Sequence, residues 1–160
     1  MVCYSGDDAR FEYVYKYVSA QPYSRATAGG HLLDNGTLYV ARFKEDGTGE
    51  WLPLVFGRNG LTPENGFRSQ ADVLVNTRAA ADFVGATKMD RPEWGAVDSS
   101  TGTVYFTLTN NTRRTAEQTD AANPRPSNQW DHIIRWNEMG DPTAQTFQWE
   151  LFVLYRFGVR

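Results

Sequence analysis

The sequence predicts a mainly β protein built from short antiparallel strands. Runs rich in β-branched and aromatic residues recur along the chain, and short turn signals separate them. Aromatic residues make up 14% of the 160 residues, which favours pleated, half-buried surfaces over helices.

The strand signals follow one another in chain order. Residues 11–18 alternate so that Phe11, Tyr13, Tyr15 and Tyr17 share one face of a strand. Further strands are expected at 37–43, 103–109, 131–136 and 146–155, and the apolar, strand-like pattern continues to residue 160. Tight turns are expected at 34–36, 46–47 and 100–102. The pattern is typical of an antiparallel meander.

A short repeat adds a second level of organisation. A tight turn followed by Gly-Thr-aliphatic-Tyr occurs at Gly36 and again at Gly102. Repeated turn-strand units are typical of propeller blades, although the spacing exceeds the roughly 40–50 residues of common blades. The repeat therefore indicates either two blades with an insertion between them or a coincidence of common strand residues.

The insertion contains one predicted helix near 70–84. Ser69 and Asp72 fit a capping box, apolar residues then recur at helical spacing, and Gly85 ends the pattern. We expect this helix to pack against the outside or the top of the sheet. The polar, proline-broken tract 110–130 is expected to form either the rim of a site or a solvated connection.

Charge and hydropathy exclude two classes of partner. The net charge is -3, and the only dense basic cluster is Arg113-Arg114, so nucleic-acid binding is not expected. No apolar run approaches the roughly 18 residues of a membrane span. The first residues have neither the basic start nor the apolar centre of a signal peptide.

The chemistry available to a metal is that of oxygen ligands. Cys3 is the only cysteine and is expected to be a buried, inert thiol, and His31 and His132 do not have zinc-ligand spacing. Carboxylates suit calcium or ferric iron, and the candidates are Asp7, Asp8, Asp90 and Glu93. The alternative is structural: Asp7 and Asp8 cap amides or pair with arginine, and Arg91 pairs with Asp90 or Glu93.

Several tracts, taken in order, resemble a known family. They are GDDARFEYVYKYVS, LLDNGTLYVARF, ATKMDRPEW, TGTVYFTLTNNTRR, DAANPRPSNQWDHIIRW and GDPTAQTFQWELF, and they cover most of residues 4–152. Their order is similar to the middle of the PhoX-type alkaline phosphatases. The resemblance implies a partial β-propeller of several antiparallel blades, in a periplasmic or secreted enzyme that hydrolyses phosphomonoesters with calcium and ferric iron.

The resemblance also implies roles for particular residues. Glu93, in the Asp-Arg-Pro-Glu tract, is the first candidate for a metal ligand, and Arg91 would support it or contact substrate. Arginine is suited to binding phosphate through two hydrogen bonds. The other residues expected to contact substrate or shape its pocket are Asn110, Asn111, Asn123 and Arg125.

The sequence departs from the family in ways that affect the expected activity. The family's upstream cysteine-containing metal motif and its downstream blades have no counterpart here, so residues 1–160 are expected to form a single partial domain. We expect no turnover from this chain alone, and self-association through open strand edges. The alternatives are a non-catalytic propeller fragment or a calcium-binding module that recognises carbohydrate or protein.

Overall fold

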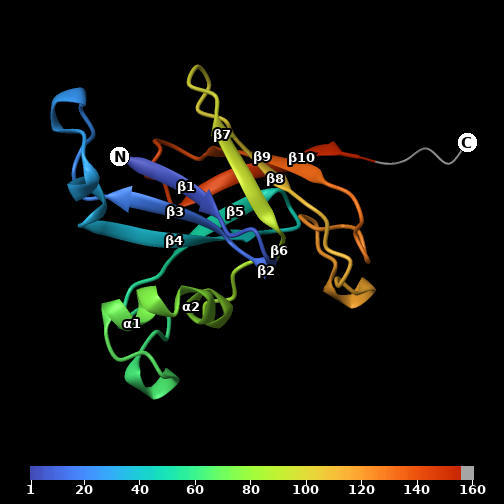
Figure 1. Ribbon diagram of the computed structural model, residues 1–160, viewed down its shortest axis with the longest axis horizontal. Coiled ribbons are helices and arrows are strands. Elements are labelled where there is room, and N and C mark those ends of the chain that lie inside the picture. Colours follow the sequence, from blue (N-terminus) through green and yellow to red (C-terminus); the bar gives the residue numbers. More distant parts are fainter. Residues whose placement is uncertain (156–160) are drawn as a thin grey trace, which may run out of the picture.

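The computed structural model describes residues 1–155, and an eight-stranded antiparallel sheet dominates it. One half of the sheet contains β1 (Val2–Gly6), β3 (Val14–Ser19), β4 (Gly36–Phe43) and β5 (Thr48–Pro53). The other half contains β7 (Pro92–Val97), β8 (Val104–Leu108), β9 (His132–Glu138) and β10 (Thr146–Leu154). The halves join through β5 and β10, and the sheet curls until β1 and β7 contact each other (Figure 1). The predicted mainly β, partial β-propeller architecture is confirmed.

The strand predicted at 11–18 is divided in two. Phe11 has a left-handed backbone with φ of 64°, and Tyr13 separates β2 (Arg10–Glu12) from β3. β2 leaves the main sheet and pairs with β6 (Met89–Asp90), with Arg10 opposite Asp90. The prediction of one continuous strand is therefore wrong, and the break brings two distant segments together.

The predicted helix is present at the expected place but is interrupted. Asn76 has non-helical dihedral angles, so the segment forms α1 (Gln70–Val75) and α2 (Thr77–Phe83). The Asn76 side chain donates to the carbonyl and to the carboxylate of Asp72 at 3.0 and 2.7 Å, and such local bonds compete with helix continuation. No helix within residues 1–155 combines the length and apolar composition needed to cross a membrane.

Two hydrophobic clusters lie on opposite faces of β3 and β4. The inner cluster fills the curled sheet with aromatic rings, among them Phe43, Trp51, Trp136 and Phe147. In the outer cluster, Tyr15 and Val40 of the sheet pack against helix residues such as Val73 and Ala80. Figure 1 shows the two helices beside this part of the sheet. Both faces of β3 are therefore buried, and the helices cover the outside of the sheet as expected.

The other strands expected from the sequence are present in the sheet. The strands expected at 37–43, 103–109, 131–136 and 146–155 correspond to β4, β8, β9 and β10, whereas 156–160 lie outside the described residues. The two copies of the Gly-Thr repeat do not occupy equivalent places in the sheet, because β4 is the third strand of its half and β8 is the second strand of the other half. Cys3 is exposed rather than buried, because alternate residues of β1 face outwards. Within residues 1–155 there are also four short 3-10 helices: Arg25–Thr27, Gly30–Leu33, Pro63–Asn65 and Ala116–Gln118.

We expect Gly6→Ala to separate the two edges of the curled sheet. A methyl group there would lie 2.7 Å from a ring carbon of Phe106 and 2.8 Å from Cβ of Pro92, and nearer still to the Pro92 carbonyl oxygen. Overpacking of this kind costs about 1–3 kcal/mol. Urea unfolding measures the loss, with Gly30→Ala as control because a methyl group there meets nothing within 4 Å. Equal stability of the two variants would contradict this prediction.

Candidate functional site

Pairing of β2 with β6 creates a pocket between segments that are far apart in the sequence. Residues 8–10 come from the turn before β2 and from β2 itself, Arg91 follows β6, and Arg78 reaches over from α2. The pocket has a volume of about 530 Å³ and is lined by Asp8, Ala9, Arg10, Arg78, Arg91 and Arg113. We call it the arginine pocket.

The arginine pocket has more positive than negative charge. Asp8 accepts from Arg91 at 3.0 Å, and Glu12 pairs with Arg78 at 2.8 Å. Burial raises the pKa of Glu12, and Arg78 opposes that rise. The Nε atom of Arg10 is buried and has no hydrogen-bond partner within residues 1–155. Four guanidinium groups therefore outnumber the three nearby carboxylates of Asp7, Asp8 and Glu12, and the surplus favours an anion.

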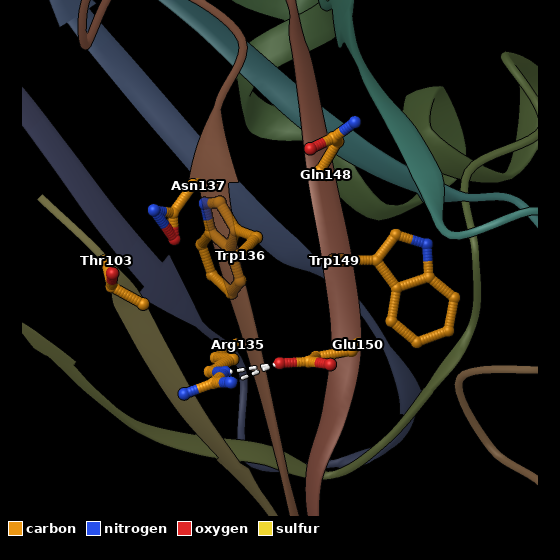
Figure 2. Close-up of a pocket in the computed structure, with 7 residues that line it drawn as sticks. All are labelled: Thr103, Arg135, Trp136, Asn137, Gln148, Trp149 and Glu150. Carbon is orange, nitrogen blue, oxygen red and sulfur yellow. Dashed lines mark hydrogen bonds and ion pairs between the residues drawn. The ribbon is translucent and has the colours of Figure 1, made fainter.

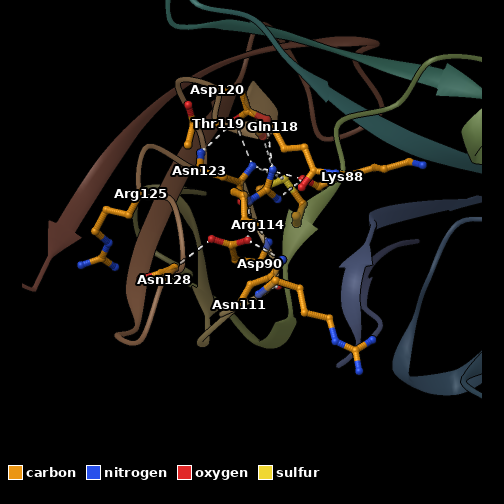
Figure 3. Close-up of polar contacts among 12 residues, drawn as sticks. Lys88, Asp90, Asn111, Arg114, Gln118, Thr119, Asp120, Asn123, Arg125 and Asn128 are labelled. Carbon is orange, nitrogen blue, oxygen red and sulfur yellow. Dashed lines mark hydrogen bonds and ion pairs between the residues drawn. The ribbon is translucent and has the colours of Figure 1, made fainter. Parts of the chain in front are cut away.

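Asp90 lies beside the arginine pocket but points away from it into the protein. Its carboxylate is fully buried and accepts from Arg114 Nε at 2.6 Å, Asn111 Nδ2 at 2.9 Å and Asn128 Nδ2 at 3.0 Å (Figure 3). Both carboxylate oxygens are thus occupied by donors of the chain. Arg91 pairs with Asp8, so the expectation that it pairs with Asp90 or Glu93 is wrong.

The polar tract 110–130 is ordered around this buried carboxylate. Arg114 also donates to the carbonyls of Gln118 and Lys88 at 2.5 and 2.6 Å, and the backbones of Asn111 and Asn128 form a β-bridge. Hydrogen bonds therefore hold the loop at its centre as well as at its two ends.

The residues expected to contact substrate occupy three kinds of position. Asn110 accepts from the Arg91 guanidinium at 3.2 Å at the edge of the arginine pocket. Asn111 and Asn123 are fully buried, and Asn123 Oδ1 accepts from the Asp90 amide at 2.9 Å. Arg125 donates to the carbonyls of Trp130 and Asp131, both at 3.1 Å, and points away from the Asp90 network in Figure 3. The structure places Arg91 in the lining of the pocket, in contact with Asn110, which does not line it, and places the other three around the loop.

The metal-binding capacity of the described residues is small. Glu93 is exposed on β7 and does not line the arginine pocket, whereas Asp8 and Asp90 are already engaged by arginines. Within residues 1–155, no group of three or more His, Cys, Asp or Glu is placed to hold a metal ion. Calcium takes six to eight oxygen ligands. These residues do not fit a complete calcium or iron site.

His132 has a structural position. Its side chain is buried on β9, its Nε2 lies 2.9 Å from the Ala122 carbonyl oxygen, and its Nδ1 has no hydrogen-bond partner in the part of the chain that the structure describes. Burial lowers the pKa of His132, because the charged ring would lose its hydration.

This lowered pKa predicts a loss of stability in mild acid. The unfolded chain takes up the imidazole proton first as the pH falls below about 6.5, so stability falls between that pH and the lower pKa of the folded state. Urea unfolding between about pH 7.5 and pH 5 measures the slope. We expect His132→Gln to remove part of the slope and His31→Gln, at an exposed position, to keep it. Identical slopes for all three proteins would contradict the assignment.

A second hollow lies on the outer face of β8, β9 and β10. It is lined by Thr103, Arg135, Trp136, Asn137, Gln148, Trp149 and Glu150 and has a volume of about 540 Å³. Arg135 and Glu150 face each other across it, with Nε donating to Oε1 at 2.6 Å (Figure 2). Because its two charged groups pair with each other, this hollow offers less to an anion than the arginine pocket.

Sequence reasoning did not find three of the pocket's arginines. Arg10, Arg78 and Arg113 lie on β2, α2 and the 110–130 loop. No spacing in the sequence relates them, because the pairing of β2 with β6 and the packing of the helices bring them together. The pairing depends on the left-handed backbone at Phe11, which a phenylalanine in the sequence does not signal.

Two comparisons with known proteins indicate the same family. The family model described as alkaline phosphatase PhoX matches residues 1–156. The fold is similar to that of Pseudomonas fluorescens PhoX in complex with vanadate, a transition state analogue, with a TM-score of 0.88 and 45% sequence identity. The match covers 95% of this chain and 28% of that chain. A search of curated proteins gave no significant match. With the family model spanning residues 1–156, the chain belongs to the alkaline phosphatase PhoX family.

Proposed function

We propose that this chain supplies the phosphate-recognition part of a metal-dependent phosphomonoesterase. The observation that carries the proposal is the arginine pocket, which adjoins the Asp-Arg-Pro-Glu tract in a member of a phosphatase family. A pocket with surplus guanidinium groups attracts and orients a phosphate dianion, since arginine donates two parallel hydrogen bonds to its oxygens. The vanadate bound to the Pseudomonas relative is consistent with a phosphoryl substrate.

Each pocket residue has a role in this proposal. Arg91 binds a phosphate oxygen, and Asn110 and Asp8 orient its guanidinium through contacts at 3.2 and 3.0 Å. Arg10 and Arg113 contribute the remaining positive charge. Arg78 is held by Glu12 and forms the wall on the helix side. Asn111, Asn123 and Arg125 shape the loop beside the pocket rather than contacting the phosphate.

The metal ions remain part of the proposal. Calcium and ferric iron, when bound, would neutralise phosphate charge and activate an oxygen nucleophile. Glu93 would supply one oxygen ligand, and the other ligands would come from beyond the residues described here. We also propose a periplasmic or secreted location, and self-association through those parts of the β1 and β7 edges that do not contact each other.

Replacing Arg91 should weaken binding of inorganic orthophosphate. Loss of a hydrogen bond to a charged group costs about 1.5–3 kcal/mol, so we expect the Kd of Arg91→Gln to rise roughly ten- to hundred-fold. Isothermal titration calorimetry at constant ionic strength measures it. Arg135→Gln removes the same charge from the outer face and should bind like the wild-type chain. Absence of orthophosphate binding by the wild-type chain would remove the proposed function.

We expect no phosphatase turnover from this chain alone. With calcium and ferric iron added, we expect p-nitrophenyl phosphate to remain unhydrolysed, because no group of three or more His, Cys, Asp or Glu within residues 1–155 is placed to hold a metal ion. Robust turnover would show instead that these residues suffice for catalysis.

A further inference from the structure

The buried pair Asp90–Arg114 lies between the backbones that carry the pocket's arginines. Asp90 precedes Arg91, and Arg114 follows Arg113. The guanidinium carbon of Arg114 also lies 5.2 Å from the centre of the Phe11 ring, and Phe11 follows Arg10 on β2. Arg114 therefore contacts the immediate sequence neighbours of Arg10 and Arg91 while it is itself the neighbour of Arg113.

The contacts of Arg114 require a guanidinium group. Three separate nitrogens donate to three separate acceptors: Nε to Asp90 Oδ1, Nη1 to Gln118 O and Nη2 to Lys88 O, at 2.6, 2.5 and 2.6 Å. The side chain is 2% exposed. A lysine keeps the charge but presents one nitrogen, so it cannot meet these three acceptors in their present places.

The backbone at Arg91 depends on such support. Its φ is 47°, a left-handed conformation that costs a residue with a Cβ atom roughly 1–2 kcal/mol. The amide of Asp90 on one side donates to Asn123, and the Arg91 carbonyl accepts from Thr109 at 3.1 Å. Asp90 is thus fixed at both its side chain and its backbone, and this fixes the direction in which Arg91 leaves the strand.

We infer that Asp90 and Arg114 form a positioning pair for the arginine pocket. The pair holds the backbones of Arg10, Arg91 and Arg113 so that their side chains line one pocket, although neither member of the pair lines it. The affinity for an anion therefore depends on the hydrogen-bond geometry of Arg114, and not only on its positive charge or on its contribution to the free energy of unfolding. This inference rests on the proposed function, because it names the residues that organise the same pocket.

The test compares two substitutions that both conserve charge. Arg114→Lys alters the pair, and Arg135→Lys makes the same change on the outer face. The Kd for inorganic orthophosphate is measured by calorimetry at a temperature where thermal unfolding shows each protein to be folded. We expect it to rise about ten-fold for Arg114→Lys and to stay unchanged for Arg135→Lys. Amide ¹H–¹⁵N spectra follow the backbones of residues 10, 91 and 113, which should shift only in Arg114→Lys.

Each outcome decides the inference. Weaker orthophosphate binding with shifted amides supports it, whereas a lower melting temperature with unchanged affinity would make the pair merely structural. If the wild-type chain binds no orthophosphate, the proposed function fails, and the amide shifts alone decide whether the pair positions the arginines. If Arg114→Lys does not fold, Asn128→Ala replaces it, and the same two measurements apply. This change removes the 3.0 Å contact to Asp90 Oδ2 together with the 3.2 Å hydrogen bond that Asn128 Oδ1 accepts from the Trp130 amide.

Discussion

Lys16→Met is expected to lower the free energy of unfolding by about 3–5 kcal/mol, the usual cost of removing one partner from a buried ion pair. Lys16 on β3 is 1% exposed, and its Nζ lies 3.0 Å from Glu138 Oε2. The Glu138 side chain is 6% exposed. The substitution leaves this carboxylate buried without a cation, which accounts for most of the expected loss.

The surroundings of the pair explain why Lys16 is tolerated inside the sheet. Its ammonium group donates to the Ala144 carbonyl at 2.7 Å and lies 5.2 Å from the centre of the Trp51 ring. Glu138 accepts from the Tyr4 hydroxyl at 2.6 Å and from Trp51 Nε1. Burial lowers the pKa of Lys16, and the contact with Glu138 opposes that effect.

The control for Lys16→Met is a lysine with a similar partner at the surface. Lys44 pairs with Glu50 at 3.2 Å, and its side chain is 46% exposed. Lys44→Met should cost less than about 1 kcal/mol. Lys16→Met combined with Glu138→Gln should recover much of the loss, because the neutral amide can still accept from Tyr4 and Trp51. Urea unfolding of all four proteins measures these differences, and equal losses at Lys16 and Lys44 would contradict the prediction.

Lys16 also shows how far residue patterns could predict the fold. Alternation placed the strands at β8, β9 and β10, because each of them has one regularly buried face. β4 was placed by its β-branched and aromatic residues, although it is buried on both faces. Alternation failed at 11–18, where Tyr13, Val14, Tyr15 and Lys16 are all buried. Helices cover one face of β3 and the inner cluster covers the other, and the alternation of a half-buried strand cannot express burial on both faces.

The candidate site was predictable only where it lies in one continuous segment. The Asp-Arg-Pro-Glu tract drew attention to Arg91, which does line the arginine pocket. Asn111 and Asn123 could not be distinguished from pocket residues, because whether a loop asparagine faces inwards depends on a buried partner elsewhere in the chain. That partner is Asp90, which the sequence presents as one more acidic residue in a charged tract.

Arg114→Met and Asp90→Asn should each destabilise the chain by about 3–5 kcal/mol, since each leaves a buried group without its partner. Whole domains are stable by roughly 5–15 kcal/mol, so the variants are best unfolded with urea in a stabilising osmolyte. Arg135→Met and Glu150→Gln form the matched surface pair. The coupling energy between Arg135 and Glu150 should stay below about 1 kcal/mol.

The double variant, Arg114→Met with Asp90→Asn, measures how much of the lost stability belongs to the ion pair itself. If Asp90 and Arg114 act as one unit, the double variant loses less than the two single variants together, with a coupling of up to about 3 kcal/mol. It should still remain below the wild-type stability, because Asn111 and Asn128 donate to the same carboxylate and an asparagine at 90 cannot accept from every donor. Additive losses would mean that the loop is held by the asparagines and not by the ion pair. The positioning of Arg91 and Arg113 would then have to be sought in the β-bridge between Asn111 and Asn128.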